Sequence, residues 1–312
     1  MFCRHCGVYG AVRCGYSNGK QRWLCHECHR TFVLKGITTR RERQKIWFER
    51  WIIEGYTIRQ LVTHSGYSRS TVRRIISYWL DRVPEESVNL ARFKYLVLDG
   101  TYLIKRRIVL VGLADPVAKS LVTGCYDLKE GESRMRDYCL QLRHAGLVPI
   151  SVTIDGLKQV HTMLESVWPE ARIQRCLVHI QRQGLAWCRR DPKTAAVKHL
   201  RHLFCRVMSI SSVTERDEFL AAWQDWEERF GQPIASRPSR GKVFSDVKRA
   251  RSLLLYALPY MFHYLEDPLI PRSTNWIEGY FSRLKARYRQ HRGLSPKHRA
   301  NYFKWYFHLC KK

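Results

Sequence analysis

The chain has 312 residues, 45% of them hydrophobic and 12% aromatic, which is enough apolar material for two or three folded domains and argues against disorder. Its formal net charge of +28 and its pI of about 10.0 predict a polyanionic partner, because phosphates neutralise the self-repulsion of so many cations. Residues 1–90 hold 16 Lys and Arg against 7 Asp and Glu, and residues 272–312 hold 11 against 1. This distribution favours nucleic acid over a membrane surface.

The sequence predicts a cytoplasmic protein without a membrane-spanning segment. No apolar stretch follows the N-terminal Met1, so we expect no secretory signal, and the most apolar later stretch, residues 252–265, is short and contains Pro259. The 11 cysteines are an odd number. In a reducing compartment we expect metal ligation or burial to explain them, and not disulfides.

Residues 1–36 contain two Cys-x-x-Cys pairs separated by 18 residues. Each pair lets two thiolates reach one tetrahedral Zn²⁺, which can fold a segment too short to bury a core. We therefore expect a zinc ribbon with a structural Zn²⁺ on Cys3, Cys6, Cys25 and Cys28; the alternative is four unligated cysteines. Residues 15–19 predict a hairpin turn and residues 22–24 a strand. The nearby side chains expected not to bind the metal are Cys14, His5, His26 and His29.

Residues 37–88 predict a helix-turn-helix domain. Helical spacing over residues 40–54 places Ile46, Trp47 and Trp51 on one side. A second helix is expected near residues 56–62, and a glycine-bearing turn at residues 65–68 leads into a third helix over residues 69–80, capped by Ser68.

The third of these helices has the composition of a recognition helix, although short matches of this kind are also common by chance. Its inward face is predicted to contain Val72, Ile75, Ile76 and Trp79. Its outward face would present to the major groove of DNA the side chains of Arg69, Ser70, Arg73 and Arg74. Residues 84–87 then have the composition of a linker.

Residues 89–312 predict an α/β domain, which makes the whole chain a multidomain protein of mixed α+β and α/β class. Strands are expected at residues 94–102, 107–114 and 119–126, joined in an antiparallel meander whose second turn contains Asp115-Pro116, so Asp115 is expected to be a turn residue. The elements that follow are a helix at 132–147, a strand at 148–156, a helix at 156–167 and a strand at 171–176.

Two of these strands carry the same dipeptide, Asp99-Gly100 in the first and Asp155-Gly156 in the fourth. One Asp-Gly is an ordinary turn. Two carboxylates at one edge of a sheet, however, are what a pair of divalent cations requires. The two-residue period of the fourth strand places Ser151, Thr153 and Asp155 on the face opposite Ile150, Val152 and Ile154.

Near the C-terminus, Glu278 has two interpretations. Asn275-Trp276-Ile277-Glu278 fits a capping box, with Asn275 as N-cap and Glu278 returning to its amide. Glu278 is also the one acid among eleven basic residues in 272–312, and a third carboxylate is what the two aspartates lack. Earlier in the chain, Cys176 ends a strand and His179 begins a helix; such residues are most often buried and exposed, respectively, and we assign neither to a metal.

The order of the elements resembles the RNase H-like fold of the DDE transposases and integrases. Residues 175–179 (Arg-Cys-Leu-Val-His) and 273–279 (Ser-Thr-Asn-Trp-Ile-Glu-Gly) are similar to the Cys-x-x-His and Thr-Asn-x-x-Glu signatures of Mutator-like bacterial insertion-sequence transposases. In that group a helical insertion separates the second Asp from the Glu. The gap here is 123 residues (278 − 155), and its helical patterns at 197–207 and 215–230 fit an insertion at about 182–271.

This resemblance implies that Asp99, Asp155 and Glu278 form a catalytic triad with His179 as an active-site neighbour. It implies two Mg²⁺ ions, with Mn²⁺ as an alternative, Asp99 bridging both and the other two acids holding one each. The implied reaction is hydrolysis at the element end, followed by attack of the freed 3′-hydroxyl on target DNA. The implied partners are double-stranded DNA, as terminal inverted repeats and as target, and further copies of the chain in a homo-oligomer associated with a bacterial nucleoid.

The basic C-terminal region fits such a partner. Four side chains in or after the helix of Glu278 are expected to contact phosphates: Arg283, Lys285, Arg287 and Arg289. The aromatic residues within 302–307 could stack on bases, but packing of the last helix onto the sheet is the simpler interpretation.

Two other functions are compatible with the sequence. One is a DNA-binding regulator with a zinc ribbon, a helix-turn-helix and an inactive RNase H-like domain, against which the presence of all three acids argues. The other is a structure-specific nuclease, which would give no strand-joining product.

Overall fold

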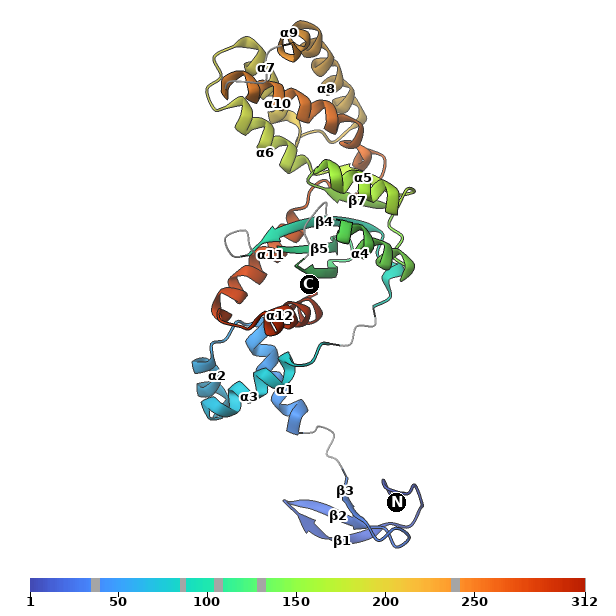
Figure 1. Ribbon diagram of the computed structural model, residues 1–312. Coiled ribbons are helices and arrows are strands. Elements are labelled where there is room, and N and C mark those ends of the chain that lie inside the picture. The colour runs from blue at the N-terminus through green and yellow to red at the C-terminus, as the bar shows by residue number, and fades with distance from the viewer. Residues whose placement is uncertain (35–39, 85–87, 104–108, 128–132, 237–241, 312) are drawn as a thin grey trace. The chain divides into compact units, whose positions relative to one another are not determined.

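The computed structural model describes residues 1–34, 40–84, 88–103, 109–127, 133–236 and 242–311 (Figure 1). The chain divides into two compact units, Met1–Trp79 and Leu80–Lys312. Among the described residues no helix is long and apolar enough to cross a membrane.

The first unit begins with a three-stranded antiparallel sheet, made of β1 (Val12–Ser17), β2 (Lys20–Leu24) and β3 (Thr31–Val33) in that order. The turn between β1 and β2 is tighter than predicted. It consists of Asn18 and Gly19, which have φ angles of 47° and 73°, whereas Gly15 lies within β1 where the pairing with β2 shifts. The mixed fold with a small N-terminal sheet agrees with the predicted zinc ribbon.

Three helices complete the first unit: α1 (Arg40–Ile53), α2 (Ile58–Ser65) and α3 (Arg69–Leu80). Thr57 begins α2 with a capping box, and Gly66, with a φ of 68°, ends it in the left-handed conformation that glycine adopts without strain. The Ser68 hydroxyl accepts a hydrogen bond from the Thr71 amide, so Ser68 caps the next helix as predicted.

The predicted inward face of α1 was partly wrong. Trp51 is buried, but Ile46 is 48% exposed, and Phe48 and Ile52 are fully buried instead. The Phe48 ring stacks on Trp79 with centroids 6.2 Å apart, so contact with α3 rotates the buried stripe of α1 away from Ile46.

The second unit is built on a mixed sheet with the strand order β6-β5-β4-β7-β8. Its strands are β4 (Tyr95–Tyr102), β5 (Val109–Asp115), β6 (Ser120–Tyr126), β7 (Ser151–Ile154) and β8 (Arg172–Arg175). The first three pair antiparallel, and β7 and β8 run parallel to β4, which confirms the predicted meander and mixed sheet. The fourth strand is shorter than predicted, because Val148 and Ile150 lie before it and are 46% and 44% exposed.

Helices cover both faces of this sheet (Figure 1). Side chains such as Leu98 and Ile154 pack with α4 (Ser133–His144) and α5 (Lys158–Val167) in one hydrophobic cluster. The other face contacts α11 (Asn275–Tyr288) and α12 (Pro296–Leu309). The aromatic residues of α12 are buried, namely Tyr302, Phe303, Trp305, Tyr306 and Phe307, which confirms packing as their role.

Between β8 and α11 the chain forms a group of helices with its own hydrophobic core, which includes Phe204, Phe219 and Trp226. The helices are α6 (Leu177–Cys188), α7 (Ala195–Arg206), α8 (Val213–Trp226), α9 (Gln232–Ala235) and α10 (Lys242–Ala257), with a π-helical turn at Glu227–Gly231. Short 3₁₀ turns lie at Leu90–Arg92, Leu258–Tyr260, His263–Leu265 and Arg289–His291. The predicted helical patterns at 197–207 and 215–230 correspond to α7 and to α8 with its π turn. Of the linker predicted at 84–87, residues 85–87 lie outside the described part of the chain.

Candidate active site and metal centre

The four cysteines of the N-terminal pairs form one cluster, in which all sulfur atoms lie within 4.8 Å of one another. The Sγ atoms of Cys3 and Cys28 are 3.6 Å apart, as are those of Cys6 and Cys25. A tetrahedral Zn²⁺ with bonds of about 2.3 Å needs sulfurs about 3.8 Å apart, so the four side chains fit this ion. Of the described residues, four neighbours predicted not to bind lie outside the cluster: Cys14, His5, His26 and His29.

One of these thiols is poised to ionise. Burial raises the pKa of Cys3, but hydrogen bonds from the amides of Cys6 and His5 outweigh it, and the pKa falls to about 6. The thiolate is the form that binds a metal ion.

In the second unit, the strand register brings the two predicted aspartates to the same level of the sheet. Val97 of β4 lies beside Thr153 of β7, and the same register carried two residues further places Asp99 level with Asp155. Asp99 accepts a hydrogen bond from the Gly100 amide at 2.8 Å, and Asp155 accepts one from the Leu157 amide at 3.1 Å. Both carboxylates therefore lie at neighbouring strands and are partly fixed by their own backbone.

Glu278 reaches this region because the chain returning from the helical group is bound to the ends of β7 and β8. The Thr153 hydroxyl donates to the Pro271 carbonyl at 2.6 Å, and the Leu177 amide donates to the Arg272 carbonyl at 2.9 Å. The Thr274 amide lies 3.4 Å from the sulfur of Cys176. These contacts start α11 beside the strands that carry the aspartates.

Two glycines let the C-terminal helices approach the sheet closely. Gly112 of β5 pairs with Asp99 on one side and with Gly124 of β6 on the other. A β-carbon at Gly112 would lie 3.0 Å from atoms of Ile277 and Phe281, which flank Glu278 in α11. A β-carbon at Gly124 would lie 2.7 Å from the ring of Phe307.

The carboxylate of Glu278 is turned toward the first turns of α6 and does not cap α11. The N-cap of α11 is Thr274 and Asn275 is its first helical residue, so the capping-box interpretation is wrong. The Oε1 atom of Glu278 lies 3.5 Å from His179 Nε2 and 3.5 Å from the Thr274 hydroxyl. Its Oε2 atom lies 4.0 Å from Arg182.

His179 is half-buried. Its Nε2 atom faces Glu278, and its Nδ1 atom is held by two further residues. Nδ1 lies 3.2 Å from the sulfur of Cys176, which is buried at the N-cap of α6, and 3.4 Å from the Thr274 hydroxyl. The hydrogen bond with Cys176 raises the pKa of His179, and the charges of Glu278 and Asp99 raise it further. The surroundings of the imidazole therefore stabilise its protonated form more than water does.

The pKa of Asp99 is raised, chiefly because its carboxyl group is buried. Burial raises its pKa to about 7, and the charges of Asp155 and Glu278 add to this, while the Gly100 amide and His179 oppose it. The charges of Asp155 and Glu278 therefore both act on Asp99.

Among the described residues, only the cysteine cluster brings three or more ligand atoms within 4.8 Å of one another, so the acids do not surround a single ion. A two-ion site places its outer ligands further apart, because the ions themselves are about 3.5–4 Å apart.

Sequence reasoning missed the glycines and a buried arginine of this site. Arg175 ends β8 and donates from Nη2 to the Asp155 carbonyl at 3.2 Å. Gly112 carried a signal, since an isolated glycine in a strand often marks close approach of another element. Arg175 carried none, because a charged residue at a strand end is ordinarily exposed.

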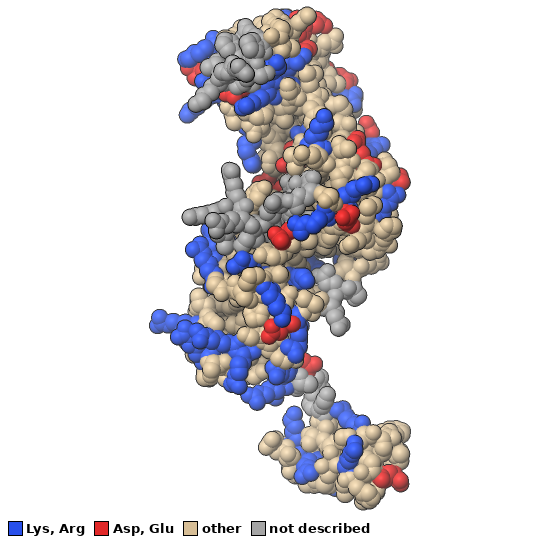
Figure 2. Space-filling view, in the orientation of Figure 1, with Lys and Arg blue, Asp and Glu red and all other residues tan. Residues whose placement is uncertain are grey.

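Basic side chains are exposed on both units. On α3 the predicted outward residues are exposed, namely Arg69, Ser70, Arg73 and Arg74, and Val72, Ile75 and Ile76 are buried with Trp79 half-buried. Figure 2 shows Lys and Arg gathered over α2 and α3. In the second unit Arg283, Arg287 and Arg289 are exposed and Lys285 is half-buried.

A mixed sheet that sets Asp99 level with Asp155, and whose central strand contacts the helix of Glu278, defines an α/β protein with a candidate divalent-cation site. Residues 35–301 match the family model described as "Transposase, Mutator family". Because this match covers most of the chain, the chain belongs to the Mutator family of transposases.

Individual relatives are more distant. The chain is 25% identical over 236 residues to the transposase for insertion sequence element IS905 of Lactococcus lactis subsp. lactis (strain IL1403), covering 72% of this chain and 54% of that protein. It is 23% identical over 198 residues to the transposase for insertion sequence element IS1201 of Lactobacillus helveticus, covering 61% and 51%. The chain thus spans about half the length of these curated relatives.

Proposed function

We propose that the protein is a DNA transposase that cleaves the ends of a mobile element and joins them to target DNA. Its catalytic residues are Asp99, Asp155 and Glu278, with His179 as their neighbour. The observation that supports this proposal is the strand register that sets Asp99 level with Asp155, together with Glu278, which is held 3.5 Å from His179 on a helix that contacts β4.

The three acids suit Mg²⁺ or Mn²⁺, since carboxylate oxygens are the ligands these ions prefer and mutual repulsion disappears when a cation is bound. Bound at this site, two such ions would activate the attacking hydroxyl and relieve charge at the scissile phosphate. Asp99 would lie between the two other acids, because β4 pairs with β7, which leads to Asp155, and contacts α11, which carries Glu278.

His179 is a positioning residue in this proposal. Its Nε2 holds one oxygen of Glu278 at 3.5 Å, and its Nδ1 is held by Cys176 at 3.2 Å. The second oxygen of Glu278 lies 4.0 Å from Arg182 and would be the one left to bind a cation.

The remaining parts of the chain would hold DNA. We propose a zinc ribbon over residues 1–36, a helix-turn-helix domain over 37–88 and an RNase H-like catalytic domain over 89–312, with its helical insertion at about 182–271. The exposed basic face of α3 would enter the major groove of the terminal inverted repeats, and the basic residues of α11 would contact phosphates. A homo-oligomer would bring two ends together.

The test is Mg²⁺-dependent nicking of a duplex that carries the element's terminal repeat. Asp99→Asn and Glu278→Gln should each lower nicking by about 10³-fold, the loss that follows removal of a preorganised charge, and should leave DNA affinity unchanged. Asp137→Asn on the exposed face of α4 is the matched control and should nick normally.

Three outcomes would contradict the proposal. If Asp99→Asn nicks DNA at the parental rate, Asp99 is not catalytic and the assignment of the triad is wrong. Tight binding by the parent without nicking under any divalent cation would favour the DNA-binding regulator. Nicking without any joined strand would favour a structure-specific nuclease.

A further inference from the structure

Arg175 is a buried cation whose guanidinium is only partly satisfied. The residue is 2% exposed, and of its three nitrogens only Nη2 donates a hydrogen bond, to the Asp155 carbonyl. Nε and Nη1 have no hydrogen-bond partner within the described part of the chain. Burying a charge is unfavourable unless an anion or further hydrogen bonds compensate it.

The position of the guanidinium is fixed by its surroundings. Gly156 has a φ of 105°, and a β-carbon there would lie 1.8 Å from Nη2, so the guanidinium occupies space that any other residue at 156 would fill. The guanidinium carbon lies 5.3 Å from the centre of the Tyr256 ring, whose neighbour His161 is 5.9 Å away. Burial lowers the pKa of Arg175, which is the direction expected for a cation that lacks a carboxylate partner.

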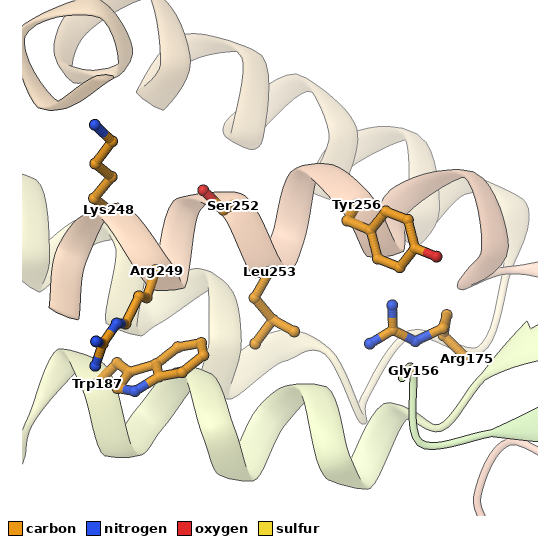
Figure 3. Close-up of a pocket in the computed structure, with 8 residues that line it drawn as sticks. All are labelled: Gly156, Arg175, Trp187, Lys248, Arg249, Ser252, Leu253 and Tyr256. Atoms are coloured by element: carbon orange, nitrogen blue, oxygen red, sulfur yellow. The ribbon is translucent and has the colours of Figure 1, made fainter. Parts of the chain in front are cut away.

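The guanidinium borders a cavity of about 470 Å³ between α6, α10 and the segment after β7. Figure 3 shows Arg175 and Tyr256 at one end, Trp187 with Lys248 and Arg249 at the other, and Ser252 and Leu253 between them. The lining includes three basic residues and no acidic one, although Arg249 keeps an ion pair with Asp246 at 3.7 Å and the Lys248 side chain points away from Trp187 and Arg175 in Figure 3. The cavity therefore suits an anion.

The rest of the lining is suited to a base and not to a bare anion. Trp187 is half-buried, and Leu253 lies between it and Arg175 (Figure 3). Aromatic faces beside basic side chains are the combination by which proteins hold unpaired nucleotides. A cavity of this volume is in the range of small-molecule sites and cannot admit a duplex.

We propose that this cavity binds one unpaired nucleotide of the DNA strand beside the scissile phosphate, with the phosphate on Arg175 and the base against Trp187 and Leu253. The inference rests on the proposed function, because Arg175 contacts the main chain of Asp155 and so ties the cavity to the candidate active site. The nucleotide would supply the anion that Arg175 lacks and would hold the strand in register with the acids.

Photo-crosslinking in EDTA tests this placement without any catalysis. The probe is a terminal-repeat duplex with a short single-stranded tail that carries 5-iododeoxyuridine, and the crosslinked residue is located by mass spectrometry. We expect crosslinks at Trp187 or Tyr256 with the tailed probe and none at these residues with the fully paired probe. An excess of deoxynucleoside monophosphate should not compete.

Binding measurements on the same two probes distinguish the contribution of Trp187 from that of Arg175. Trp187→Ala should weaken the tailed probe about tenfold, the value of one stacked base, and should leave the paired probe unchanged. Arg175→Gln should weaken the tailed probe and lower the slope of log affinity against log salt by about one, as loss of one phosphate contact does. Arg175→Lys should restore part of both. Arg190→Gln removes an exposed arginine that follows α6 outside the cavity and serves as the control.

The inference fails if crosslinks avoid α6 and α10, or if Trp187→Ala weakens both probes equally. It also fails if the monophosphate competes as well as the tailed probe, which would make the cavity a free-nucleotide site. If Arg175→Gln abolishes nicking while every probe binds normally, Arg175 only supports the Asp155 turn. The proposed function is tested separately, by the loss of nicking in Asp99→Asn. The crosslinking and binding results can therefore contradict this inference without contradicting the proposed function.

Discussion

The two candidate metal sites of this protein are built in opposite ways. The cysteine cluster comes from residues 3–28, and the hydrophobic cluster around it has four buried members among the described residues, two of which, Cys3 and Cys25, belong to the candidate metal site themselves. The acids come from residues 99–278 and are held by strand register, by hydrogen bonds such as that from the Thr153 hydroxyl to the Pro271 carbonyl, and by a large core. In the N-terminal ribbon the metal would produce the fold, whereas in the second unit the fold produces the site.

The largest effect should come from breaking the ribbon site. Cys25→Ser removes one of the four sulfurs, and because structural zinc contributes about 10–16 kcal/mol to folding of such a segment, we expect residues 1–34 to lose zinc and become open to proteases. Zinc content and limited proteolysis measure this. Cys14→Ser lies outside the cluster and should keep both zinc and protection; a protected, zinc-free Cys25→Ser ribbon would mean that the metal does not hold this fold.

The acid site should instead keep its structure without metal. Its buried carboxylate should lower the free energy of unfolding. The folded-state pKa of Asp99 is about 7, above the ordinary 3.8, so the folded state keeps a proton that the unfolded state releases. Stability is then lost as the pH rises from about 4 to about 7, by at most about 4 kcal/mol, and stays level above that.

Asp99→Asn should remove this pH-dependent loss of stability, because asparagine carries no titratable group. In urea titrations with EDTA, the variant should equal the parent near about pH 4 and exceed it above about pH 7, and excess Mg²⁺ should stabilise the parent alone. Asp137→Asn should follow the parent throughout. Parallel pH curves for parent and Asp99→Asn would show that Asp99 is not perturbed in the folded state.

A smaller effect is expected from separating α11 from the sheet. Gly112→Val places a side chain where atoms of Ile277 and Phe281 would lie 3.0 Å from its β-carbon, and overpacking of this kind costs about 1–3 kcal/mol. Since Glu278 moves with α11, nicking should fall as well.

The control is Gly279→Ala, which adds a β-carbon to the same helix with only Arg283 at 4.0 Å. It should raise stability by about 1 kcal/mol. If Gly112→Val is destabilised but nicks DNA normally, the close packing at Gly112 does not position Glu278.

The smallest effect should come from the hydroxyl that lies among Cys176, His179 and Glu278. Thr274→Val keeps the shape but removes contacts of 3.6, 3.4 and 3.5 Å to these residues. A hydrogen bond of this kind contributes about 1 kcal/mol, so we expect that loss in urea unfolding and about fivefold slower nicking. Thr274→Ser should behave as the parent; equal loss in both variants would assign the effect to packing.

The sequence by itself determined the features that short windows encode. Cysteine spacing identified the four sulfurs that cluster, helical periodicity identified the buried and exposed sides of α3, and two Asp-Gly pairs identified the aspartates that the register brings level. Each depends on residues within about one element of each other, where backbone geometry alone fixes which side chains are neighbours.

Only the tertiary structure decided the rest. Local sequence favoured a capping role for Glu278, but contacts between Thr153 and Pro271 and between Cys176 and Thr274, 118 and 98 residues apart, turn its carboxylate toward His179. The rotation of α1, the close approach at Gly112 and the buried guanidinium of Arg175 likewise depend on partners remote in the chain. Such contacts are fixed by how elements pack against one another, and no local pattern of residues contains that information.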